Sequence, residues 1–313
     1  MWGYIVRRLL ATIPVMGVVA VFVFLLLHLA PGDPAAVVAG SYAMPKDVER
    51  IREKLGLNEP IHIQFGKWIS NVVQGDLGDS IFSEVPVTRL IAQRIEPTLS
   101  LATASILIAI VLAVPLGIVA AWKAGTWIDH GVMVFAVLGF SIPVFVIGYV
   151  LMYGFSIKAQ IFPVQGFVSI RQGLIPFLRT ITLPSIALGL IYAALIARIT
   201  RASLLEVLGE DYIRTAHAKG LQPRAVLLRH ALKNASVPIV TIIGVGIAML
   251  IGGVVVTESV FNIPGLGRLV VDSVLARDYP AIQGLTLMFS AVYLLINLMV
   301  DISYTFLDPR IHY

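Results

Sequence analysis

The chain has 313 residues, of which 58% are hydrophobic and only 13% are charged, and its mean hydropathy is +0.90. A soluble domain carries about 25% charged residues and lacks long uncharged apolar runs, so we interpret the chain as an integral membrane protein. The net charge of +5 could suit a nucleic-acid-binding protein, but the basic residues stand where membrane topology requires them. The chain has no cysteine, which excludes disulfides, thiolate nucleophiles and cysteine metal sites.

The first apolar run begins after a basic pair. Arg7 and Arg8 precede an uncharged stretch over residues 9–30, which is long enough to cross about 30 Å of hydrocarbon. It is too long for the core of a signal peptide, so residues 1–30 are predicted to form an uncleaved transmembrane anchor with a cytoplasmic amino end. We interpret His28, near the outer end, as an ordinary interfacial side chain rather than a metal ligand.

Residues 31–97 form the one long stretch with the composition of a soluble segment. Their nine acidic residues outnumber seven basic ones, and a helix is expected at about residues 45–55, ended by Gly56. A segment of this length translocates regardless of its charge, so we place it outside the cytoplasm between the first and second spans. It either helps to close the pathway or receives a binding protein, or it is a structural cap on the helices.

Five further spans complete an all-α fold with six transmembrane helices and a cytoplasmic carboxyl end. Trp122 and Trp127 are expected to anchor the second and third spans at the membrane interface, and Pro143 is expected to kink the third, with Ser141 satisfying the freed backbone. An irregular outer loop is expected at residues 156–180. The five spans are predicted at residues 98–122, 131–155, 181–197, 237–257 and 284–306.

The connection over residues 198–238 is the most polar part of the second half. Its seven basic residues exceed three acidic ones, which places it in the cytoplasm by the positive-inside rule. Asp211 is expected to cap a helix over residues 211–219, which Gly220 closes in a left-handed conformation, and Pro223 opens a second helix to about residue 234. The first helix is expected to expose Tyr212, Ile213 and Ala216. It either inserts into a groove on a partner or lies on anionic lipid.

A second irregular element follows the fifth span. Pro264-Gly265 breaks the chain, and residues 266–276 are predicted to form a short helix that lines an outer gate. Glu258 pairs with an arginine or contacts a substrate amine, with the pairing favoured. The residues expected at the gate or path are Glu258, Phe261, Pro264, Gly265, Asp278 and Tyr279.

One carboxylate lies deep in the sixth span. Because such a group usually has a partner, Asp301 is predicted to pair with Arg198 or Arg201, which fall at the same membrane face.

Several motifs resemble one family. The stretch Tyr-x-Arg-Thr-Ala-x-Ala-Lys-Gly, which ends at Gly220, resembles the coupling loop of the permeases of ATP-binding-cassette importers, in their dipeptide, oligopeptide and nickel subfamily. Of the general loop pattern Glu-Ala-Ala, three residues, Gly, nine residues, Ile-x-Leu-Pro, only Ala216, Gly220 and Leu232 match literally, and the proline comes five places later, as Pro238. Residues 30–34, 64–68, 75–80, 258–268, 277–283 and 307–310 extend the resemblance.

The resemblance implies a type I importer permease in a bacterial inner membrane, with residues 98–310 as the permease domain. It implies partners: a second homologous permease subunit, two cytoplasmic ATPases that use ATP and Mg²⁺, and an extracytoplasmic binding protein that delivers a peptide. The chain itself would bind no cofactor and hold no catalytic or metal site, and it carries no phosphate-binding loop. The residues implied to dock the ATPase are Asp211, Tyr212, Arg214, Thr215, Ala216 and Gly220.

Other functions stay open at this point. The same machinery could carry nickel chelates or glutathione-like peptides, and an ion-coupled secondary transporter is a further alternative. Against the secondary transporter, the charges cluster at the ends of the spans and we find no internal duplication. An intramembrane enzyme would need a nucleophile with its acid-base partners, which the spans do not offer.

Overall fold

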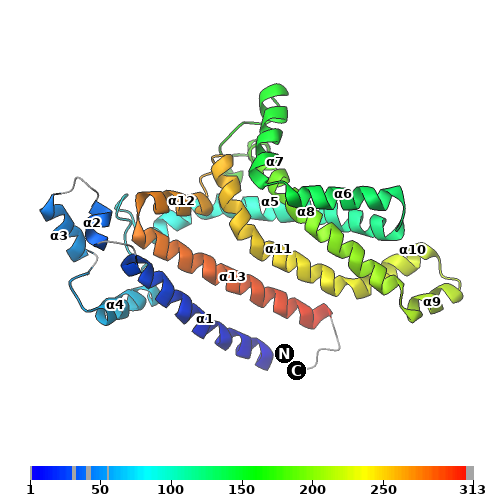
Figure 1. Ribbon diagram of the computed structural model, residues 1–313, viewed down its shortest axis with the longest axis horizontal. Helices are drawn as coiled ribbons and strands as arrows, with labels where there is room; N and C mark the ends of the chain where they lie inside the picture. The colour runs from blue at the N-terminus through cyan, green and yellow to red at the C-terminus, as the bar shows by residue number, and fades with distance from the viewer. Residues whose placement is uncertain (1, 30–32, 40–43, 55, 308–313) are drawn as a thin grey trace. The chain divides into compact units, whose positions relative to one another are not determined.

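The computed structural model describes residues 2–29, 33–39, 44–54 and 56–307, and these are built of helices joined by turns (Figure 1). The α-helices are α1 (Trp2–Leu29), α2 (Pro34–Ala39), α3 (Pro45–Lys54), α4 (Ile61–Val73), α5 (Val87–Trp122), α6 (Trp127–Ser141), α7 (Val144–Leu151), α8 (Leu174–Leu208), α9 (Asp211–Ala218), α10 (Pro223–Ala225), α11 (Leu232–Val260), α12 (Leu266–Ala276) and α13 (Tyr279–Leu307). Two π-helical turns, η1 (Met152–Lys158) and η3 (Val226–Ala231), and a 3₁₀ turn, η2 (Ile170–Gln172), complete the set.

The predicted spans correspond to long apolar helices. Within the described residues, five helices are long and apolar enough to cross a membrane, and a bent pair of helices gives a sixth candidate. The five are Arg7–Leu29, Val87–Trp122, Leu174–Leu208, Pro223–Val260 and Tyr279–Ile302. This confirms an all-helical, multi-pass membrane protein.

The third span differs from the single helix that we expected. It is broken at Ile142 and Pro143 into α6 and α7–η1, and the two halves are bent by 103°. Proline disfavours the helical conformation of the residue before it, and Ile142 is extended, with φ −87° and ψ 124°. The Ser141 hydroxyl donates to the carbonyl of Val137, at 2.8 Å. The expected bend is confirmed, and it is a full break rather than a kink.

Helix α8 is longer than the predicted fourth span at both ends, so the outer loop is shorter than expected. It begins at Leu174, where Pro176 occupies the first turn at no cost in hydrogen bonds, and it continues past Arg201 to Leu208. Charged residues mark where a chain leaves hydrocarbon, but arginine and glutamate are good helix formers and do not end a helix.

The chain forms two compact units, and one of them contains residues 97–267 and 295–307. Its core surrounds α8, with Leu188 and Ile196 fully buried among side chains of α5 and α11. The backbones approach closely at Gly189, where an added Cβ would lie 2.9 Å from the carbonyl oxygen of Ser105. Figure 1 shows α6 and α11 running alongside α8, while α7, which also contacts α8, runs in a different direction.

The other unit contains residues 2–96 and 268–294. In it α4 packs on α1 through an aromatic cluster in which the Phe24 and Trp68 rings lie 5.7 Å apart. The predicted helix near residues 45–55 is confirmed as α3, and Gly56 follows it with φ +67°. His28 contacts Gln64 through Nε2, at 3.1 Å, as expected of an ordinary interfacial side chain. Residues 30–32 and 308–310 of the motifs named above lie outside the described residues.

Candidate functional site

The polar connection between α8 and α11 folds as a short helix with a sharp end, as predicted. Gly220 has φ +77°, and its N–H donates to His217 O at 2.9 Å while Leu221 N–H donates to Ala216 O at 3.3 Å. This is the left-handed closure that glycine allows without strain. Pro223 begins α10, also as predicted, but the helix then continues through η3 into α11 without stopping near residue 234.

The predicted cap of this helix is wrong. The N-cap residue of α9 is Glu210, and no side chain caps the helix there. Asp211 lies one position further on, in the first turn, and its Oδ1 accepts from Arg214 Nη1 at 3.3 Å. From that position the carboxylate can still act favourably on the positive end of the helix dipole.

Two residues that we expected at the surface of α9 are buried. Ile213 is 2% exposed and Ala216 is 8% exposed, and both pack into an apolar cluster with side chains from α8, η3 and α11. They are three positions apart and so share one face of the helix, which turns towards the protein. The expected exposure of Ile213 and Ala216 is therefore wrong, and both side chains hold the helix against the protein.

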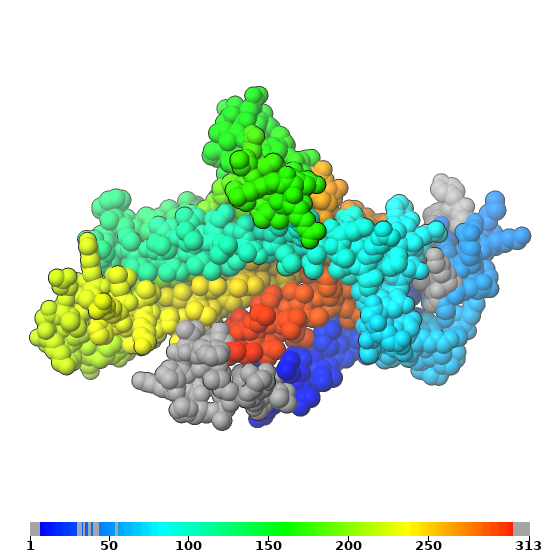
Figure 2. All heavy atoms as spheres, turned by 180° about the vertical axis from the view of Figure 1, so that it is seen from behind, coloured from blue at the N-terminus to red at the C-terminus, as the bar shows by residue number. Residues whose placement is uncertain are grey.

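The exposed residues of α9 include the predicted docking residues Asp211, Tyr212, Arg214 and Thr215, and Gly220 beyond the helix is also exposed. The Tyr212 hydroxyl accepts a hydrogen bond from Asn234 Nδ2 at 2.6 Å, which ties α9 to the start of α11. The space-filling view shows α9 and α10 at the surface in yellow-green and yellow (Figure 2). Because the inner face of α9 is packed on α8 and α11, a displacement of α9 as a rigid element would also move these two helices.

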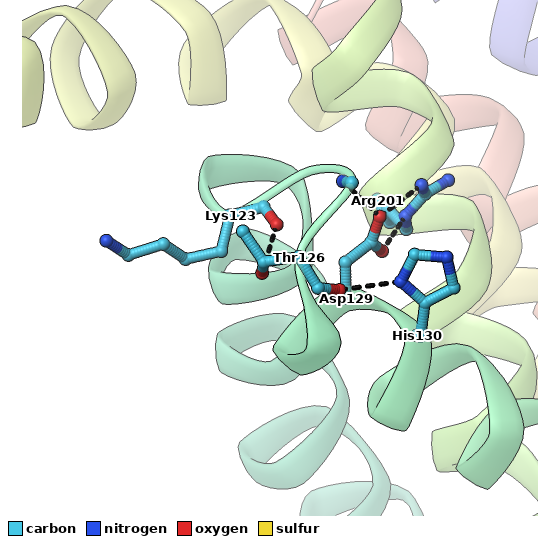
Figure 3. Close-up of polar contacts among 6 residues, drawn as sticks. Lys123, Thr126, Asp129, His130 and Arg201 are labelled. Atoms are coloured by element: carbon cyan, nitrogen blue, oxygen red, sulfur yellow. Dashed lines mark hydrogen bonds and ion pairs between the residues drawn. The ribbon is translucent and has the colours of Figure 1, made fainter.

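An ion pair braces the same unit near the amino end of α6. Arg201 donates from Nε to Asp129 Oδ1 and from Nη2 to Asp129 Oδ2, the second bond being 2.7 Å long. The Asp129 side chain is 4% exposed, and its Oδ2 also accepts from Gly125 N at 3.0 Å. Figure 3 shows the Asp129 carboxylate and the Arg201 guanidinium facing each other. The pair joins α6 and the turn before it to α8.

This pair corrects the expected partnership of Arg201 with Asp301. Arg201 uses its guanidinium on Asp129, which lies 72 positions earlier in the chain. Asp129 lies between the second and third predicted spans, residues 98–122 and 131–155, and the alternation of spans places this connection at the same membrane face as Arg201. The alternative pairing of Asp301 with Arg198 stays a prediction.

We expect Asp129→Asn to destabilise the protein by about 2–3 kcal/mol, somewhat below the ~3–5 kcal/mol for breaking a fully buried pair. The expected loss is smaller because the Arg201 side chain is 25% exposed, so solvent partly screens the interaction. Thermal unfolding of the purified protein in detergent would measure the change. The matched control is Asp47→Asn in the exposed pair with Arg50, which should cost less than about 1 kcal/mol. Equal losses in the two variants would contradict the bracing role.

A second polar node lies at the end of α11. Glu258 has no exposed surface, and its Oε1 accepts from Thr98 Oγ1 at 2.6 Å, while Thr98 Oγ1 accepts from the N–H of Leu266 at 2.7 Å. The carboxylate fills the space beside Gly265, where an added Cβ would lie 2.1–2.4 Å from the carboxyl atoms. The node thus fixes the turn between α11 and α12 to α5. Because Glu258 is fully buried, a substrate amine could reach its carboxylate only if this node opened.

The other residues predicted at the outer gate fall into two groups. Phe261 is buried beside this node and its carbonyl accepts from Gly166 N at 2.9 Å, whereas Pro264 is exposed. Asp278 and Tyr279 belong to the other unit, where Asp278 is buried and accepts from Ser80 Oγ and from Ile81 N. The short helix predicted over residues 266–276 is confirmed as α12.

Family models match two consecutive parts of the chain. Residues 113–313 match the family described as binding-protein-dependent transport system inner membrane component, and residues 1–102 match the N-terminal region described for membrane components of the same systems. The chain belongs to this family. It is therefore an inner-membrane permease component of a transport system and not a catalytic subunit, which removes the secondary transporter and the intramembrane enzyme as alternatives.

Relatives whose names give peptide or glutathione transport match this chain over 99–100% of its length. A probable peptide ABC transporter permease of Sinorhizobium fredii is 54% identical over 310 residues, which is 99% of each chain. A glutathione transport system permease of Escherichia coli (strain K12) is 45% identical, and a putative peptide transport system permease of Brucella suis is 44% identical, each over 100% of both chains.

Two solved structures share the fold. An inward-facing methionine ABC transporter aligns with a TM-score of 0.57 at 16% identity, covering 70% of this chain and 96% of that one. An amino acid ABC transporter aligns with a TM-score of 0.54 at 15% identity, covering 69% of this chain and 92% of that one.

Proposed function

We propose that this permease is one of two related subunits that form the path of an ATP-driven importer of dipeptides or oligopeptides. ATP and Mg²⁺ act on separate ATPase subunits, and a binding protein outside the cytoplasm delivers the substrate. The observation that carries the proposal is the outer face of α9, polar and exposed on a helix whose inner face is packed against α8 and α11. Such an element converts movement of a partner into movement of the spans.

The coupling role of α9 predicts that Tyr212→Ala combined with Arg214→Ala weakens ATPase binding by tenfold or more. Tyrosine and arginine supply most of the binding energy in many interfaces, and both side chains are exposed here. Co-purification of the ATPase with the tagged permease would measure the loss. Arg171→Ala, at an exposed arginine of η2, is the control and should bind the ATPase as the wild type does. Unchanged binding in the double variant would contradict docking through this face.

A peptide substrate is supported by the relatives, whose names give peptides or glutathione. Glutathione import by this chain is the second candidate, favoured by 45% identity to a glutathione permease over the whole length. Proteoliposomes that contain the complete complex would be supplied with its binding protein and either a labelled dipeptide or labelled glutathione. We expect ATP-dependent dipeptide uptake that stops when the ATPase is inactivated. Uptake that persists without ATP hydrolysis would refute the proposed ATP-driven import. Uptake confined to glutathione would refute dipeptides or oligopeptides as the substrate.

The proposed topology places both termini and residues 198–238 in the cytoplasm, and residues 31–97 outside it as a subdomain that receives the binding protein. Because the chain has no cysteine, single cysteines can report on this directly. We expect Gln74→Cys to react in intact cells with a membrane-impermeant maleimide, and Lys219→Cys to react only after the membrane is opened. Both positions are exposed. Labelling of Lys219→Cys in intact cells would contradict the coupling proposal as well.

The node of Glu258, Thr98 and Gly265 supports an outer gate at the turn between α11 and α12. The turn is irregular backbone held by buried side chains, as membrane depth requires. We propose that its movement with α11 opens and closes the path. Asp278 and Tyr279, which belong to the other unit, stay predicted gate residues by the resemblance alone.

A further inference from the structure

The turn between α5 and α6 displays two tryptophans and a lysine at the surface. Trp122 ends α5 and is 43% exposed, and Trp127 begins α6 and is 83% exposed. Lys123 follows Trp122 directly and is also exposed. Tryptophan in this position, at the end of an apolar membrane helix, is typical of the headgroup region of a bilayer.

Two cations from distant parts of the chain meet on one ring of this turn. Lys123 Nζ lies 5.2 Å from the centroid of Trp122, and Arg224 Cζ, from α10, lies 5.7 Å from the same centroid. No carboxylate of the described residues lies within ion-pair distance of either cation. An arginine stacked on a ring keeps its N–H donors in the plane of the guanidinium, where they can still bind an anion.

The turn that carries Lys123 is held rigidly. Thr126 donates to the Lys123 carbonyl from both its N–H, at 3.0 Å, and its hydroxyl, at 2.6 Å. Gly125 N donates to Asp129, which the pair with Arg201 fixes in turn. In Figure 3 the Lys123 side chain extends away from Asp129 and Arg201. The lysine is therefore presented outwards on a preorganised turn and is not engaged by the nearby carboxylate.

We propose that Trp122, Lys123 and Arg224 form a binding site for the phosphate of an anionic phospholipid, with Trp127 alongside in the headgroup layer. Two unpaired cations on one aromatic platform match a phosphodiester, which carries one negative charge and several acceptor oxygens. A lipid is favoured over a soluble anion because the site stands at the ends of two apolar helices. The bound lipid would hold α10, and with it η3 and α11, which continue from α10, against the end of α5.

Native mass spectrometry of the intact transporter complex can test this site. The complex in detergent would be titrated with phosphatidylglycerol, with zwitterionic phosphatidylcholine and with inorganic phosphate. We expect preferential retention of phosphatidylglycerol. Lys123→Gln and Arg224→Gln should each weaken its retention by about fivefold and together by about 25-fold, since each basic residue near an anionic surface contributes a similar amount. Lys158→Gln is the matched control, because Lys158 lies alone over the Tyr153 ring at 4.9 Å and should leave retention unchanged.

Each result bears directly on the proposal. Equal retention of phosphatidylglycerol by the double variant and the wild type would overturn it, as would inorganic phosphate displacing the lipid at equal concentration. Loss of the ATPase from the double variant with unchanged lipid retention would also overturn it, and would assign the patch to a protein partner. Thermal unfolding in phosphatidylcholine should be the same for all variants, because the substituted side chains are exposed.

Discussion

Among the glycines for which the structure describes the surroundings, Gly265 is expected to be the one at which alanine costs the most stability. The added Cβ would lie 2.1–2.4 Å from the Glu258 carboxyl atoms, which have no room to withdraw because Glu258 is fully buried and bonded to Thr98. Overpacking costs about 1–3 kcal/mol, and displacing the carboxylate adds the cost of its lost hydrogen bond. We expect a loss of at least about 3 kcal/mol, seen as a reduced yield of folded protein and early thermal unfolding in detergent.

The matched control for this change is Gly252→Ala on α11, the helix that carries Glu258, where an added Cβ has no neighbour within 4 Å. It should be neutral or slightly stabilising, since alanine favours a helix more than glycine does. Shortening the opposing side chain with Glu258→Asp should partly restore Gly265→Ala, so that the double variant loses less stability than the sum of the two single changes. A Gly265→Ala protein as stable as the wild type would show that the node is not the rigid element described above.

Ala216→Glu should prevent α9 from packing against the rest of the protein and should abolish binding of the ATPase. Ala216 is 8% exposed in an apolar cluster, so a glutamate there would place an unpaired charge among Leu204, Val226 and Leu227. The desolvation of an unpaired carboxylate costs several kcal/mol, more than a helix of eight residues can supply on its own. We expect substrate uptake and ATPase co-purification to fall below detection while the membrane spans still insert.

Ala218→Glu provides the same substitution two residues further on, at an exposed position. It should leave α9 in place and retain most of the ATPase binding. Comparing the two variants therefore distinguishes the effect of unpacking the helix from the effect of adding a charge to its surface. If Ala216→Glu bound the ATPase as well as Ala218→Glu does, Ala216 would not seat the helix.

Much of the fold follows from patterns that act over short distances. Long uncharged runs located the spans, and Gly220 and Pro223 marked the turn after α9 because their backbone requirements are local. The break at Pro264-Gly265 similarly predicted α12 with its observed bounds, Leu266–Ala276. These features depend on the residue itself and its nearest neighbours, which the sequence displays directly.

The features that the sequence did not reveal depend on contacts between distant residues. Nothing near Asp129 in the chain indicates that Arg201 will meet it, because the pairing follows from how α6 packs on α8. The burial of Ala216 was missed for a similar reason. On a helix of eight residues the apolar face is defined by only two or three side chains, and the neighbouring helices decide which way it turns.

The break between α6 and α7 sets a requirement on the assembled transporter. Each half of the bent pair has 15 residues and so spans about 22 Å, too short to cross the hydrocarbon core alone. Proline at the break removes a backbone donor, so carbonyl oxygens there would face lipid tails unless something covers them. Phe140, Phe145 and Tyr149 stand exposed around this elbow. If a second permease subunit pairs with this chain as proposed above, we expect it to cover the elbow, so that the third span lies at the interface between the two subunits and does not face the lipid.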